Sequence, residues 1–139
     1  MTTFFVPGIP VAQPRVKAAR IGKFIRIYTP KVADNWKRSV GLIFKQLKTG
    51  IHEGPVEVNL RFLMPRPKSH FNKKGLKPLA EVWCAKKPDV DNLAKGVYDA
   101  LTDAGAWTDD SLVVRGYIEK VYANCDGDCG CAITISALP

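Results

Sequence analysis

The chain has 139 residues, the length of one domain, and 46% of them are hydrophobic, which is enough for one core. Charged residues make up 24%, as in an ordinary globular protein, and no run of 18 apolar residues is present to span a membrane. The formal net charge of +8 favours a polyanionic partner. The N-terminal residues lack a signal-peptide pattern, so we expect a cytoplasmic protein whose four cysteines are reduced.

Acidic residues are concentrated in one segment of this basic chain. Residues 89–110 hold six of the 13 acidic residues and one of the 21 basic residues, so this segment carries a net charge of −5. The remaining residues carry +13. Bare carboxylates on a surface that attracts a polyanion are unfavourable unless a cation neutralises them. The charge pattern therefore favours a metal-dependent enzyme that acts on nucleic acid.

Hydrophobic periodicity divides the chain into strands and helices. Alternating and apolar runs predict strands at residues 3–6, 20–28, 55–64, 81–85, 112–123 and 131–138. Apolar residues three and four apart predict amphipathic helices at residues 29–48, begun by Thr29-Pro30, and at residues 91–101. Residues 65–79 are expected to form a mobile basic loop, and residues 124–130 a turn. This order predicts an α+β fold, a single domain over residues 1–139 with a mixed β-sheet and two main helices packed against it.

Two aspartates lie where a predicted strand is followed by the second helix. Asp89 and Asp91 are two residues apart, so in an extended segment their side chains point to the same side. Asp91 lies at the helix start, where backbone N–H groups favour an anion, and Lys95 follows about one helical turn later. Asp109 and Asp110 come after the helix. Mg²⁺ prefers carboxylate oxygens and keeps waters that substrate phosphates replace, so these carboxylates are candidate ligands for one or two metal ions.

The same aspartates have a simpler interpretation. An Asp-x-Asp sequence before a helix is often only a helix cap with a neighbouring acid, and a Gly-x-x-x-Asp-Asp sequence is often only a loop. Spacing alone leaves both the capping interpretation and the metal-binding interpretation open.

A wider pattern surrounds these aspartates. Residues 87–95 read Lys-Pro-Asp-Val-Asp-Asn-Leu-Ala-Lys, and they are followed by Asp99-Ala100-Leu101, Gly105, Asp109-Asp110 and Val113. This pattern resembles the signature of the RusA family of Holliday junction resolvases. The opening Pro7-Gly8-Ile9-Pro10 with Arg15, and the later Tyr28-Thr29-Pro30, are similar to the N-terminal half of phage and prophage members. The resemblance covers nearly the whole chain, although Pro88 stands where other members carry a basic residue.

The resemblance implies a Mg²⁺-dependent endodeoxyribonuclease that resolves four-way DNA junctions in recombination and repair, with Mn²⁺ able to substitute. It implies that Asp89, Asp91 and Asp110 are the metal-binding catalytic residues, and it leaves Asp109 open as an alternative to Asp110. Lys95 matches a basic residue important for catalysis. Members of the family act as homodimers, so we expect a homodimer in a bacterial or phage-infected cell.

Basic residues outside the acidic segment are candidates for contacts with the DNA backbone. The candidates are Arg15, Lys17, Arg20, Lys73, Lys74 and Lys120. For Lys120, on the strand after the third aspartate, orientation toward the active site and toward solvent are equally open.

Alternatives to a junction resolvase remain open at this point. One is a broader nuclease that acts on flaps or forks, and another is a DNA-binding module that has lost catalysis. The cysteines at 125, 129 and 131 leave a zinc site open, although Asp126-Gly127-Asp128 between them is typical of a hairpin turn.

Overall fold

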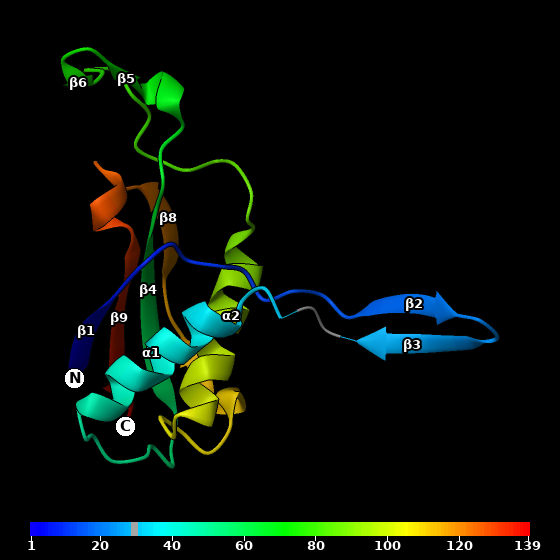
Figure 1. The fold of residues 1–139 in the computed structure, drawn as a ribbon. Helices are drawn as coiled ribbons and strands as arrows, with labels where there is room; N and C mark the ends of the chain where they lie inside the picture. The colour runs from blue at the N-terminus through cyan, green and yellow to red at the C-terminus, as the bar shows by residue number, and fades with distance from the viewer. Residues whose placement is uncertain (29–30) are drawn as a thin grey trace.

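The computed structural model describes residues 1–28 and 31–139, and a mixed five-stranded sheet lies at its centre (Figure 1). The sheet contains β1 (Thr2–Pro7), β9 (Gly130–Ala137), β4 (Val56–Met64) and, beyond β4, the short strands β7 (Val113–Arg115) and β8 (Ile118–Tyr122). Strand β9 is antiparallel to β1 and β4, whereas β7 and β8 are parallel to β4. The predicted α+β fold, with a mixed sheet and two helices in a single domain, is confirmed.

The core lies between the sheet and two helices, α1 (Asp34–Gln46) and α2 (Val90–Asp103) (Figure 1). Side chains alternate along a strand, so every second residue of β4 points into this core. The buried side chains from these three elements are Val56, Val58, Leu60, Phe62, Met64, Trp36, Val40, Phe44, Leu93, Val97 and Leu101. Burial of this one face fixes the register of β4 against its neighbours.

Both predicted helices form, with different boundaries. Helix α1 begins at Asp34, with Ala33 in the N-cap position, and the predicted cap Thr29-Pro30 lies outside the described residues. Helix α2 begins at Val90 and extends to Asp103, beyond the predicted end. Gly105 has a φ of +87°, the conformation that glycine adopts after a helix end. In the described part of the chain, no helix combines the length and the apolar character needed to cross a membrane.

The prediction of one half-buried strand over residues 20–28 is wrong. Strands β2 (Lys17–Ile21) and β3 (Phe24–Tyr28) instead form an antiparallel hairpin that projects from the rest of the molecule (Figure 1). Gly22, with a φ of +59°, begins the two-residue turn, where an L side chain would be strained. The apolar side chains are exposed rather than half-buried, with Phe24 at 79% and Ile25 at 72%.

The predicted strand over residues 112–123 is interrupted at Gly116 and Tyr117, between β7 and β8. The backbone N–H of Tyr117 donates to the Asn59 side-chain oxygen at 2.9 Å, so a side chain takes the place of a regular ladder partner. A Cβ added at Gly116 would overlap the Val58 carbonyl group. The two backbones therefore approach so closely that only glycine fits.

Two other segments also differ from the sequence prediction, whereas the turn expected over residues 124–130 is confirmed. The expected strand over residues 81–85 is reduced to a single bridge between Trp83 and Val121. The expected loop over residues 65–79 contains a 3₁₀ turn at Lys68–His70 and a short hairpin of β5 (Phe71–Asn72) and β6 (Gly75–Leu76). The expected turn over residues 124–130 contains a 3₁₀ turn at Asp126–Asp128. The bonds of Arg66 to the Ala123 and Glu81 carbonyl groups, at 2.8 and 2.6 Å, hold the start of the 65–79 loop on the body.

All four cysteines are free thiols, as expected. Cys125 is exposed, whereas Cys84, Cys129 and Cys131 are buried. Burial raises the pKa of Cys129, and it raises the pKa of Cys131 to about 12. Residues 1–28 and 31–139 contain no cluster of three side chains suited to a metal ion, so the zinc interpretation gains no support.

Candidate active site

Asp89 and Asp91 lie at the start of α2, and both are exposed. Asp89 occupies the N-cap position with an extended backbone, but within the described residues its side chain makes no capping hydrogen bond. Asp91 accepts a hydrogen bond from the neighbouring Asn92 N–H at 2.9 Å. No basic side chain of the described residues forms an ion pair with either aspartate. Asp89 therefore occupies the cap position that the capping interpretation predicts, but without a capping bond its carboxylate is available to a ligand.

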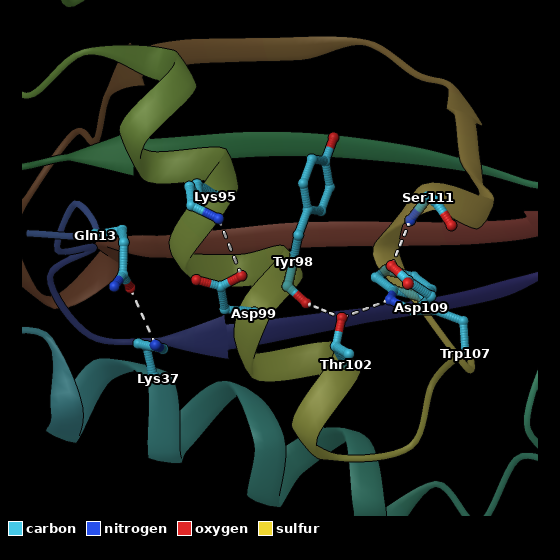
Figure 2. Close-up of polar contacts among 9 residues, drawn as sticks. All are labelled: Gln13, Lys37, Lys95, Tyr98, Asp99, Thr102, Trp107, Asp109 and Ser111. Atoms are coloured by element: carbon cyan, nitrogen blue, oxygen red, sulfur yellow. Dashed lines mark hydrogen bonds and ion pairs between the residues drawn. The ribbon is translucent and has the colours of Figure 1, made fainter. Parts of the chain in front are cut away.

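Asp109 and Asp110 form a second pair of acidic residues, after the loop that follows α2. Asp109 accepts a hydrogen bond from the Ser111 N–H at 3.0 Å, which caps the 3₁₀ turn at Asp110–Leu112 (Figure 2). This bond is the main cause of the lowered pKa of Asp109. The hydrogen bond that the protonated Asp110 carboxyl group donates to the Asp109 carboxylate is the main cause of the raised pKa of Asp110, and burial and the negative charge of Asp109 add to it. Two carboxyl groups this close favour a shared proton or a cation.

Lys95 and Asp99 lie on the α2 face that also carries Asp91, because four residues make about one helical turn. Lys95 Nζ forms an ion pair with Asp99 Oδ1 at 3.5 Å (Figure 2). The charge of Lys95 lowers the pKa of Asp110 and the charge of Asp99 raises it. Both effects are smaller than that of the hydrogen bond between Asp110 and Asp109. The structure therefore brings the predicted residues Lys95 and Asp110 near each other.

The loop before Asp109 is held against α2 by one hydroxyl group. Thr102 Oγ1 donates to the Tyr98 carbonyl at 2.8 Å and accepts from Trp107 Nε1 at 2.7 Å (Figure 2). Trp107 is 1% exposed and packs edge-on against the Tyr98 ring, with centroids 6.3 Å apart. These contacts fix the chain two residues before the acidic pair, and thus set where Asp109 and Asp110 lie relative to the helix.

Lys120, on β8, is half-buried and points toward the loop before Asp89. Its Nζ donates to the carbonyl groups of Lys86 and Pro88, the latter at 2.6 Å. Of the two orientations left open by the sequence, the one toward the active site is observed. The contacts are to backbone, so the side chain anchors the segment from which Asp89 projects.

Candidate site residues line two of the surface depressions that border α2. One has a volume of about 370 Å³ and is lined by Lys37, Asp99, Thr102, Asp103, Thr108, Asp109 and Asp110. The other has a volume of about 640 Å³ and is lined by Arg15, Lys87, Pro88, Asp89 and Asn92. Asp89 and Asp110 thus line different depressions. In residues 1–28 and 31–139, no three acidic, histidine or cysteine side chains are grouped closely enough to hold one metal ion, so the three-aspartate ligand set stays a prediction.

The predicted DNA-binding residues are all exposed except for the half-buried Lys120, and they lie in different places. Arg15 lines the same depression as Asp89, and Lys17 and Arg20 lie on the β2–β3 hairpin. Lys73 and Lys74 form the tip of the separate β5–β6 hairpin. Contact of these residues with DNA stays a prediction.

Lys37 is a site residue that the sequence analysis missed. Its Nζ donates to Gln13 Oε1 at 3.0 Å (Figure 2). Lys37 also lines the depression that contains Asp110. It comes from α1, more than fifty residues before the acidic segment, so no local pattern links it to the site. Asp99 carries a signal that could have placed it, because it follows Lys95 at the four-residue spacing of a helical ion pair.

Comparison with known proteins identifies the family and two related chains. Residues 7–135 match the family described as endodeoxyribonuclease RusA. The chain is 38% identical over 125 residues to the uncharacterized protein YqaN of Bacillus subtilis (strain 168), an alignment that covers 86% of this chain and 87% of YqaN. It is 46% identical over 46 residues to the crossover junction endodeoxyribonuclease RusA of Escherichia coli O139:H28 (strain E24377A / ETEC), covering 33% of this chain and 38% of that protein.

The family match includes both helices and every aspartate of the candidate site. The alignment with YqaN extends over most of both chains, so the relationship concerns the whole fold rather than one motif. The chain therefore belongs to the RusA family of endodeoxyribonucleases.

Proposed function

We propose that the protein is a structure-specific endodeoxyribonuclease that resolves four-way DNA junctions by Mg²⁺-dependent phosphodiester hydrolysis. The observation that carries this proposal is a set of exposed aspartates, Asp89, Asp91 and Asp110, that have no ion-pair partner among the described residues of a chain with net charge +8. Family membership supports the endodeoxyribonuclease activity. The partial similarity to a crossover junction endodeoxyribonuclease supports the four-way junction as substrate.

The donor chemistry of these residues fits Mg²⁺, a hard cation that prefers carboxylate oxygens. We propose that Asp89, Asp91 and Asp110 supply its ligands, with Asp109 beside them, although the three side chains are not grouped around one point among the described residues. Asp109 and Asp110 are adjacent in the chain and both exposed, so two negative charges lie side by side where a divalent ion can neutralise them. When bound, Mg²⁺ supplies Lewis-acid stabilisation of negative charge on the phosphate, and Mn²⁺ is expected to substitute because it accepts the same oxygen ligands.

We assign Lys95 to the scissile phosphate. Its side chain is 61% exposed, and its ion pair with Asp99 is 3.5 Å long, so the ammonium group can turn toward a phosphate at little cost. A lysine is a compact positive charge that binds phosphate without a fixed angular requirement. Lys37 is a second cation in the depression that contains Asp110 and can receive the same substrate.

We also propose a homodimer, as the resemblance implies. A four-way junction presents two strands for symmetric cleavage, and a two-fold dimer presents one active site to each. Size-exclusion chromatography with light scattering is expected to give twice the chain mass of 15.3 kDa. A particle of single-chain mass that still cuts both strands in one binding event would contradict the dimer.

Lys120 is a positioning residue in this proposal, because it anchors the segment before Asp89. Lys120→Met keeps the aliphatic stem and removes the donors to the Lys86 and Pro88 carbonyl groups. We expect the cleavage rate to fall by about 10- to 100-fold, as for a small misplacement of a catalytic group, while junction affinity changes by less than about threefold. Single-turnover kinetics and fluorescence anisotropy measure the two quantities.

Two variants complete the Lys120 experiment. Lys120→Arg retains a cationic donor and is expected to restore part of the rate, whereas a simple loss of DNA contact would appear as weaker binding by Lys120→Met. Lys45→Met, at an exposed position in the last turn of α1, is the matched control and is expected to behave as the unmodified protein. Unchanged cleavage by Lys120→Met would show that the anchor does not position Asp89.

A substrate panel tests the proposed function against its alternatives. Four-way junction, flap, fork and linear duplex of equal length, each end-labelled on one strand, are incubated with the protein in Mg²⁺ or in EDTA. We expect the junction to be cut fastest, and only with Mg²⁺. Equal rates on flap and junction would favour a broader branched-DNA nuclease. Junction binding without cleavage in Mg²⁺ or Mn²⁺ would favour a DNA-binding module without catalysis.

A further inference from the structure

The β2–β3 hairpin starts at the edge of the candidate active site. The Gln13 N–H donates to the Asn92 carbonyl at 3.0 Å, so the segment before the hairpin is fixed against the start of α2. Arg15 lines the depression that contains Asp89, and β2 begins two residues later at Lys17. Figure 1 shows the hairpin projecting away from the sheet and from both helices. A DNA strand that enters the site from this side runs along the hairpin.

The hairpin is basic. Residues 1–33 contain six basic residues and no acidic residue, and four of the six lie at Lys17, Arg20, Lys23 and Arg26. None of these four forms an ion pair with any described residue. Four unneutralised positive charges on a two-stranded ribbon are complementary to a polyanion, and they oppose contact with a second copy of the same basic hairpin.

Strand pairing gives the hairpin two faces of different chemistry, because residues directly opposite each other share a face. One face carries the pairs Lys17 with Tyr28, Ala19 with Arg26, and Ile21 with Phe24; the other carries Ala18 with Ile27 and Arg20 with Ile25. On the first face the Arg26 guanidinium lies over the Tyr28 ring, 5.8 Å from its centroid. Basic groups interleaved with aromatic rings are the composition that binds DNA backbone and stacks on bases. The second face is mostly aliphatic.

Phe24 lies at the tip of the first face, next to the Gly22–Lys23 turn, and is 79% exposed. A two-stranded ribbon is narrow enough to enter a groove of DNA. A junction differs from a linear duplex in offering bases at its branch point that can unstack. We propose that the β2–β3 hairpin is a DNA-binding arm that lays its basic and aromatic face on the substrate and stacks Phe24 on a base at the branch point. The inference rests on the proposed function and names the element that distinguishes branched from linear DNA.

The test compares binding of a labelled four-way junction and of a linear duplex, with Ca²⁺ in place of Mg²⁺ to prevent cleavage. Phe24→Ala is expected to weaken junction binding by about 5- to 150-fold, the range for loss of one aromatic–base stack, and to leave duplex binding within about twofold. Phe24→Trp is expected to retain junction binding. Ile25→Ala, on the aliphatic face, is the matched control and is expected to bind as the unmodified protein.

A second readout addresses the stack and the charges separately. A 2-aminopurine base at the branch point is expected to lose fluorescence when the protein binds, and Phe24→Ala is expected to abolish this change. Arg26→Ala is expected to weaken binding to both DNAs. It is also expected to reduce the slope of the logarithm of the binding constant against the logarithm of salt concentration by about one, as for the loss of one phosphate contact. Thermal unfolding checks that the exposed substitutions leave the fold unchanged.

The outcomes separate this inference from the proposed function. If the unmodified protein neither prefers nor cuts the junction, the proposed function is wrong. If it does both but Phe24→Ala binds the junction equally well, only the arm is wrong. If Phe24→Ala and Ile25→Ala both convert a dimer into a monomer in sedimentation, the hairpin is a protein–protein element, and this too overturns the inference.

Discussion

Asp89→Asn is expected to lower the rate of junction cleavage by about a thousandfold, because several kcal/mol of transition-state stabilisation depend on the metal ion that this carboxylate holds. Asparagine keeps the shape of the side chain but lacks the negative charge that a hard cation needs. Within the described residues, Asp89 makes no capping hydrogen bond and no ion pair, so the substitution leaves the fold and the affinity for DNA nearly unchanged. Asp91→Asn is expected to give the same result.

Single-turnover cleavage and equilibrium binding of the same labelled junction measure these effects. Asp126→Asn is the matched control, since Asp126 lies in the turn between β8 and β9 and is exposed. A normal cleavage rate for Asp89→Asn would remove this residue from the active site. An equal loss in Asp126→Asn would mean that net charge, rather than a ligand, controls the rate.

Trp107→Ala is expected to lower the free energy of unfolding by about 3–5 kcal/mol, the usual cost of truncating a buried aromatic residue. Trp107 is 1% exposed, and its Nε1 donates to Thr102 Oγ1 at 2.7 Å. Because it also fixes the loop before Asp109, cleavage is expected to fall even at temperatures where the variant is folded. Urea unfolding followed by circular dichroism gives the stability, and cleavage at low temperature gives the activity.

Trp83→Ala is the matched control for Trp107→Ala. Trp83 is 61% exposed, so the same substitution is expected to change the free energy of unfolding by less than about 0.5 kcal/mol. If the two variants were equally stable, Trp107 would not be the buried anchor described here. If Trp107→Ala lost stability but kept full activity in the folded state, the position of the acidic pair would not depend on this residue.

The sheet and the helices could be predicted because burial imposes a period on the sequence. In β4, every second residue from Val56 to Met64 is buried, and the alternation is visible in the sequence. In α2, Leu93, Val97 and Leu101 recur at helical spacing and are all buried. The ends of the helices were less predictable, because local turns and side-chain bonds such as that of Thr102 decide them.

The hairpin shows where periodicity fails. An alternating sequence is the same whether a strand lies on a core or projects as a ribbon, so residues 20–28 were assigned a buried face that they lack. The available signal was Gly22, since a glycine followed by one residue between alternating segments is typical of a two-residue turn. Exposure of Phe24 and Ile25 depends on the absence of any covering element among the described residues, which no local pattern reports.

The candidate site was located by charge, by spacing and by the resemblance to the RusA family, but its geometry was not. The α2 period placed Lys95 next to Asp91 on one helix face, and both positions agree with the sequence. The separation of Asp89 from Asp110 depends on the loop after α2, which Trp107 and Thr102 hold in place through contacts that spacing does not encode. Lys37 reaches the site from α1 for the same reason.

The most direct measurement of the central claim is strand-resolved cleavage of a synthetic four-way junction by the purified protein. We expect paired nicks in two opposing strands near the branch point, in Mg²⁺ or Mn²⁺ but not in EDTA, and their loss in Asp89→Asn. Intact strands in every metal, or nicks that persist unchanged in Asp89→Asn, would contradict it.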